Sequence, residues 1–123
     1  METSRERIME VIQDLSRLTD TPGEGVTRFS YGELDRKARE YIIGKMEEMG
    51  LTVTVDPVGN LLGRWESEHP QRPPMLVGSH LDSVRCGGPY DGITGVACAV
   101  EAVRTLMGRG KEPQRPVEVI VFA

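Results

Sequence analysis

Three residues in the second half of the chain have side chains that could bind a metal ion. His80 and Asp82 lie in the run GSHLDS, directly after an apolar segment, and Asp91 follows eleven positions after His80. Because residues i and i+2 of an extended segment point to one side, Asp82 can hold the imidazole of His80 and raise its basicity as a ligand. Glycines and a proline at 87–89 can turn the loop back toward the strand end. This spacing favours a metal site that uses His80 and Asp91.

Each of these residues also has an ordinary structural interpretation. A histidine at a strand end is commonly just hydrogen bonded, Asp82 could cap the loop, and Asp91 could be the N-cap of a following helix. His69 lies in a polar loop and is predicted to be a surface residue. Cys86 has no second soft ligand at a suitable spacing and is left out of the ligand set. The spacing alone leaves both interpretations open.

The first half of the sequence predicts two amphipathic helices. Thr3 and Glu6 have capping-box spacing, and apolar residues then recur at the helical period, which predicts a helix over 4–18. A second capping box begins at Ser30, and its helix is predicted to end at Gly50.

The elements that must position the site follow these helices. Alternating apolar residues around a Gly-Asn turn predict a β-hairpin over 51–65. A buried strand at 75–78, a helix from Ile93 and a strand at 117–123 form a βαβ unit. The last strand is apolar, as expected inside a parallel sheet covered on both faces. The predicted fold class is α/β, and the carboxyl ends of such strands are where ligands bind.

Composition excludes several classes of protein. The 123 residues are 38% hydrophobic and 28% charged, with a net charge of -4 and no long run of either sign, so no nucleic-acid partner is predicted. No apolar stretch approaches the ~18 residues that span a bilayer, so no membrane partner is predicted. The charged start of the chain differs from a signal peptide and predicts a cytoplasmic location. The two cysteines, Cys86 and Cys98, are predicted to be free thiols.

Longer stretches of the sequence carry a family resemblance. Residues 78–106 read GSHLDSVRCGGPYDGITGVACAVEAVRTL, and residues 27–64 read TRFSYGELDRKAREYIIGKMEEMGLTVTVDPVGNLLGR, with GVTR ending at Arg28 and GN in the hairpin turn. Together they closely resemble the N-terminal part of the hydantoinase/carbamoylase-type amidohydrolases. This branch of the dinuclear metallopeptidase superfamily contains N-carbamoyl-L-amino-acid hydrolases, allantoate amidohydrolases and β-ureidopropionases. The resemblance implies a zinc-peptidase-like catalytic domain.

The resemblance also implies roles for the three residues. His80 becomes a terminal ligand of one metal, Asp91 a carboxylate that bridges two divalent ions, and Asp82 a catalytic residue that tunes His80. Zinc, manganese, cobalt and nickel all accept such ligands. The implied reaction is the hydrolysis of a linear C–N bond in a small carbamoyl or ureido substrate, such as an N-carbamoyl amino acid or allantoate.

The same resemblance implies that further catalytic groups follow the strand at 117–123, among them a pair of glutamates. Residues 1–123 are therefore expected to be the N-terminal part of the catalytic domain, without the dimerisation lid domain, and to be inactive alone with weak or no metal occupancy. Two alternatives are a non-catalytic truncated fold that acts through protein association, and a deacylase or dipeptidase of the wider superfamily. The apolar strand at 119–123 is expected to leave apolar surface and unpaired backbone exposed, which predicts a homo-oligomer that associates through the strand 117–123.

Overall fold

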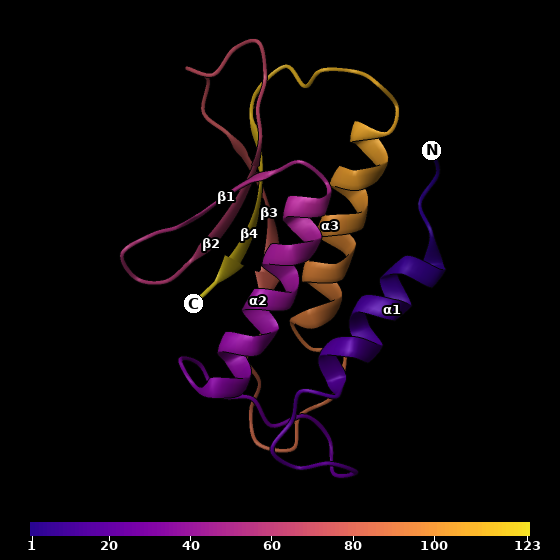
Figure 1. Cartoon of the computed structure of the whole chain (residues 1–123), viewed down its shortest axis with the longest axis vertical. Helices are drawn as coiled ribbons and strands as arrows, with labels where there is room; N and C mark the ends of the chain where they lie inside the picture. The colour runs from indigo at the N-terminus through magenta and orange to yellow at the C-terminus, as the bar shows by residue number, and fades with distance from the viewer.

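The computed structural model describes all 123 residues and shows a sheet with its helices on one face (Figure 1). The elements follow in the order α1 (Arg5–Ser16), α2 (Glu33–Glu48), β1 (Thr52–Val55), β2 (Leu61–Trp65), β3 (Met75–His80), α3 (Ile93–Met107) and β4 (Val117–Phe122). Helices α2 and α3 pack against the strands, and α1 packs against α3. None of these helices is both long and apolar enough to cross a membrane.

The predicted hairpin and βαβ unit are both present. The four strands are ordered β1-β2-β4-β3, with β1 antiparallel to β2 and β3 parallel to β4. Strand β4 also pairs antiparallel with β2, so the sheet is mixed rather than all parallel. Because β4 is central, the prediction of unpaired backbone at 117–123 is wrong, and the edge strand of the βαβ unit is β3. Its first residues, Met75 and Leu76, are exposed, so the prediction of a buried strand at 75–78 is also wrong.

The two faces of the sheet differ in what covers them. Val119 and Val121 are buried in the core with residues of all three helices. Side chains alternate along a strand, so Ile120 and Phe122 lie on the opposite face, which no helix covers. The expectation of a sheet covered on both faces is therefore wrong. The prediction of exposed apolar surface along this strand is also wrong at Val119 and Val121, because both side chains are buried in the core, and self-association stays a prediction.

Both helix starts differ from the predicted capping boxes. The side chain that caps α1 belongs to Ser4 rather than Thr3, and its Oγ accepts a hydrogen bond from Arg7 N at 3.2 Å. Helix α2 begins after Gly32 without a side-chain cap. Instead, the carboxylate of Asp35 accepts a hydrogen bond from Tyr31 N, which holds the turn before the helix. The capping-box spacing to Glu6 favoured Thr3, but serine is the stronger N-cap residue of the two, and the structure uses Ser4.

Candidate functional site

The three predicted site residues lie together at the carboxyl end of β3. His80 is the last residue of this strand, Asp82 follows in the loop, and Asp91 directly precedes Gly92, the N-cap residue of α3. The β1–β2 turn lies at the same end of the sheet, because Leu61 at the start of β2 pairs with Val121 near the end of β4. The site therefore occupies the edge where open α/β sheets bind ligands.

Asp82 holds one nitrogen of the His80 ring. The Nδ1 atom of His80 lies 3.0 Å from the backbone oxygen of Asp82 and 3.2 Å from its Oδ1. Both of these oxygens are acceptors, so Nδ1 carries the proton in the neutral ring and Nε2 carries the lone pair. The Nε2 atom lies 3.8 Å from Oδ2 of Asp91. The lone pair of His80 and the carboxylate of Asp91 are thus close enough to contact one cation.

The side chains of this site remain accessible. The side chains are 38% exposed at His80, 35% at Asp82 and 78% at Asp91. The N-cap position of α3 is taken by Gly92, and no side chain caps this helix. The structural interpretation of Asp91 as an N-cap is therefore wrong, and its carboxylate is free to contact a ligand.

Gly92 makes room for the His80 ring. Its φ of 72° lies in the left-handed region, and a Cβ added there would lie 2.6 Å from Nδ1 and 2.6 Å from the backbone oxygen of His80. Both the backbone conformation and the contact require glycine at this position. Sequence analysis did not select Gly92.

The loop that carries Asp82 is held by the segment 26–28. Val26 and Gly87 form an isolated β-bridge, and Thr27 Oγ1 accepts a hydrogen bond from Cys86 N at 2.8 Å. Ser83 Oγ donates to the backbone oxygen of Val26 at 2.8 Å. These contacts join the GVTR segment to the site loop over more than fifty positions of sequence, as the separations of 57 and 59 residues show.

Arg28 lies beneath this loop and is fully buried. Burial lowers the pKa of its guanidinium, while the negative charges of Asp35 and Asp82 act in the opposite direction. Sequence analysis did not select this residue as functional. A charged residue in a polar stretch gives no periodic signal of burial, so only the GVTR resemblance drew attention to it.

Other candidate ligands lie outside the site. His69 is half-buried in the loop between β2 and β3, where its backbone N donates to Ser67 Oγ at 3.0 Å. Cys86 and Cys98 are both exposed free cysteines. No group of three or more His, Cys, Asp or Glu residues in the chain is arranged to hold a metal ion. The chain thus brings together two donors, His80 and Asp91, with Asp82 behind the first.

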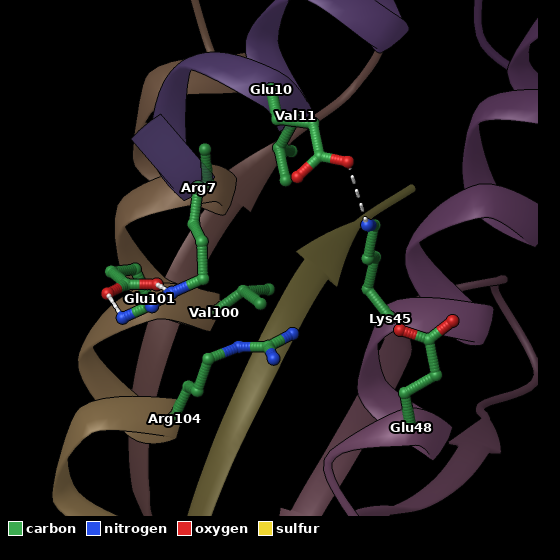
Figure 2. Close-up of a pocket in the computed structure, with 9 residues that line it drawn as sticks. Arg7, Glu10, Val11, Lys45, Glu48, Val100, Glu101 and Arg104 are labelled. Atoms are coloured by element: carbon green, nitrogen blue, oxygen red, sulfur yellow. Dashed lines mark hydrogen bonds and ion pairs between the residues drawn. The ribbon is translucent and has the colours of Figure 1, made fainter. Parts of the chain in front are cut away.

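A concave region, the interhelical groove, lies between α1, α2 and α3 (Figure 2). Its volume is about 90 Å³, and it contains none of the site residues. Figure 2 shows Arg7 of α1 against Glu101 of α3, and Lys45 of α2 pointing toward Glu10 of α1. Arg104 also lines the groove. Opposite charges alternate around it, so we assign this groove to helix packing.

Together, the βαβ unit and the histidine and aspartates at its carboxyl end are features of metal-dependent hydrolases with an α/β fold. The sequence model of peptidase family M28 matches residues 60–123, and the chain belongs to that family.

Two relatives and one solved structure show how similar the chain is to known proteins. It is 44% identical over 117 residues to an N-carbamoyl-L-amino-acid amidohydrolase of Paenarthrobacter aurescens, covering 95% of this chain and 28% of that protein. It is 42% identical over 111 residues to a ureidoglycolate hydrolase of Oryza sativa, covering 90% of this chain and 23% of that protein. An amidase of the hydantoinase/carbamoylase family from Burkholderia multivorans matches with a TM-score of 0.93 and 34% identity, over 98% of this chain and 29% of that one.

These matches confirm the predicted family and fold class. The chain spans about a quarter of the length of the relatives that it matches, 23% of the ureidoglycolate hydrolase and 28% of the N-carbamoyl-L-amino-acid amidohydrolase. It therefore corresponds to a portion of a zinc-peptidase-like catalytic domain.

Proposed function

We propose that the chain supplies His80, Asp82 and Asp91 to the metal centre of an amidohydrolase that cleaves linear C–N bonds of small carbamoyl or ureido compounds. The observation that carries this proposal is the arrangement of His80. Its Nδ1 is held by Asp82, and its free Nε2 lies 3.8 Å from Asp91 Oδ2. This arrangement occurs in a chain that belongs to peptidase family M28.

The donor set fits a divalent cation. Metal–ligand distances to histidine nitrogen and carboxylate oxygen are about 2.0 to 2.2 Å, so donors separated by 3.8 Å can contact one ion. Asp82 fixes the tautomer that leaves Nε2 free, as carboxylates beside metal-bound histidines commonly do. The carboxylate of Asp91 has a second oxygen for a second ion. When bound, divalent ions supply Lewis-acid activation of a hydrolytic water.

Two donors are fewer than the three protein ligands of a typical catalytic zinc site. We therefore expect the 123-residue chain to bind zinc or manganese weakly and to show no turnover of N-carbamoyl amino acids. His80 and Asp91 would bind the ion, and Asp82 would orient His80. None of these three side chains is left to accept a proton from the attacking water, and such assistance is typically worth about 10² to 10⁴-fold in rate.

The substrate class is proposed from the relatives. One relative is named for N-carbamoyl-L-amino acids and another for ureidoglycolate, and both compounds contain a planar ureido group attached to a carbon that bears a carboxylate. We propose a substrate of this shared chemistry, and allantoate belongs to the same class. A cytoplasmic location stays a prediction from the sequence.

A chimeric enzyme tests this function. This chain would replace the matching segment of the N-carbamoyl-L-amino-acid amidohydrolase of Paenarthrobacter aurescens, with which it shares 44% identity. We expect metal-dependent hydrolysis of N-carbamoyl-L-amino acids, lost in His80→Ala and Asp91→Asn and retained in the control His69→Ala. A folded chimera that keeps its activity in His80→Ala would contradict the proposal. Preference for N-acyl amino acids or dipeptides would instead support the deacylase alternative.

A further inference from the structure

The contacts of Arg28 are unusual for a buried charge. No part of its side chain is exposed, yet none of its hydrogen bonds goes to a carboxylate. Its Nε donates to the backbone oxygen of Leu81 at 2.8 Å. Its Nη1 donates to the backbone oxygens of Leu15 and Leu18, both at 2.7 Å. One guanidinium thus joins the end of α1 to the residue that follows His80.

Burial of this charge is only partly compensated by hydrogen bonds. The Nη2 atom of Arg28 is buried and has no hydrogen-bond partner. A buried polar group without a partner costs about 1 to 3 kcal/mol, and more when it is charged. The charges that act on Arg28 are those of Asp35 and Asp82, which favour its cationic form. One of these two acidic residues is the partner of His80.

The backbone of Arg28 contacts the same loop one residue beyond Asp82. Its N donates to Ser83 Oγ at 2.9 Å, and its oxygen accepts a hydrogen bond from Ser83 N at 2.8 Å. Arg28 therefore holds Leu81 through its side chain and Ser83 through its backbone. These are the two neighbours of Asp82, so the position of Asp82 depends on Arg28 from both directions.

We propose that Arg28 is a positioning residue for the metal ligand His80: by fixing the residues on both sides of Asp82, it holds the oxygens that keep the proton on Nδ1. This inference deepens the proposed function and rests on it, because the free Nε2 of His80 is the atom proposed to bind the metal ion. The planar fork of arginine suits this role, since it donates to three carbonyl oxygens from two nitrogens. Lysine keeps the charge but lacks the fork.

The first measurement is the tautomer of His80 in the metal-free 123-residue chain. Long-range ¹H–¹⁵N spectra of histidine-labelled protein distinguish the two ring nitrogens, and His69→Gln assigns the two histidines. We expect the wild type to show the Nδ1–H tautomer. In Arg28→Lys and in Ser83→Ala we expect a mixture with the Nε2–H form, with the larger change in Arg28→Lys. The control Val103→Ala, a buried core residue of α3, should keep the wild-type spectrum while losing stability.

The second measurement is the affinity for zinc, followed by calorimetry. We expect Arg28→Lys to weaken binding about tenfold, in the range found when a partner of a metal-bound histidine is lost. Val103→Ala should bind as the wild type does.

A wild-type tautomer in folded Arg28→Lys would overturn the inference. If Arg28→Lys does not fold, an unchanged His80 spectrum in Ser83→Ala would overturn it, and a changed one would support it. If the wild-type chain binds zinc too weakly for calorimetry, the spectra decide whether Arg28 positions His80, and the activity of the chimera with His80→Ala decides the proposed function. Zinc binding with unchanged spectra in the variants would refute only the role of Arg28.

Discussion

Two regions of the molecule bury charge in different ways. In the interhelical groove, the side chain of Glu101 is 4% exposed and pairs directly with Arg7, whose Nη2 lies 2.6 Å from Oε1 and whose Nε lies 2.9 Å from Oε2. The backbone N of Ser4 donates to the same carboxylate at 2.7 Å. Beneath the site, Arg28 is also buried, but its hydrogen bonds go to backbone oxygens.

This difference predicts whether a substitution in each region changes only the stability of the fold or also the geometry of the site. In the groove, the buried charge of Glu101 is compensated by Arg7 in direct contact, so removing Arg7 should change stability and leave His80 as it is. The charge of Arg28 is balanced across the site loop, where Asp82 contributes to its electrostatic environment. A change at Arg28 should therefore alter both the stability of the fold and the geometry of the site.

The largest effect is expected for Arg28→Met. This variant leaves the backbone oxygens of Leu18 and Leu81 without their donor, while the oxygen of Leu15 loses Arg28 but still accepts a hydrogen bond from Leu18 N at 3.1 Å. Each lost partner costs about 1 to 3 kcal/mol, partly offset because methionine avoids the burial of a charge, so we expect the free energy of unfolding to fall by about 4 kcal/mol. Urea denaturation would measure it. A loss no larger than that of Arg7→Met would remove the distinction between the two regions.

Sequence reasoning predicted many of the helices and strands, because turn residues and hydrophobic periodicity are local patterns. The turn at Gly59 and the helical period after Ile93 predicted the hairpin and α3. The eleven-residue spacing between His80 and Asp91, with a glycine-rich loop between them, predicted that both would meet at the end of β3, where the structure places them. Their role as metal ligands stays a prediction.

Other features depend on contacts between distant parts of the chain, which a local pattern does not carry. Burial of Arg28 results from partners near 15, 18 and 81, so no window of sequence around Arg28 predicts it. The central position of β4 results from its pairing with β2 as well as β3. An apolar strand is expected both in the middle of a parallel sheet and beside a hairpin. Because of this ambiguity, unpaired backbone was wrongly predicted at 117–123.

Two glycines allow a position at the site to be compared with a position elsewhere in the fold. Gly92 and Gly50 both have positive φ, 72° and 85°, but only at Gly92 would a Cβ meet His80. Gly50→Ala should cost about 1 kcal/mol from backbone strain alone, and Gly92→Ala about 3 kcal/mol from strain and contact. Thermal unfolding measures both costs. Zinc affinity should fall only in Gly92→Ala, and an equal fall in both variants would contradict the role of this contact.

Arg7→Met tests the groove. It removes the cation that pairs with Glu101, while Ser4 N still donates to the carboxylate and Thr105 Oγ1 lies 3.4 Å away. Because the side chain of Arg7 is 37% exposed, water can replace part of the interaction, and we expect a smaller loss in the free energy of unfolding than in Arg28→Met. The ¹⁵N spectrum of His80 should not change. A shift of its tautomer would show that the groove and the site are coupled after all.

The smallest effect is the contribution of Glu101 to the pH dependence of stability. Hydrogen bonds from Arg7 hold the pKa of the Glu101 carboxyl below its ordinary value of 4.5. A carboxyl with a lowered pKa in the folded state stabilises the protein at pH values above the unfolded pKa, and this contribution is lost as the pH falls through the folded pKa. Wild type should therefore exceed Glu101→Gln in stability at neutral pH, and the difference should shrink as the pH falls below about 4.5. Urea denaturation of both proteins at a series of pH values measures this difference. A difference that stays constant on acidification would mean that Glu101 contributes through its shape and packing rather than through its charge.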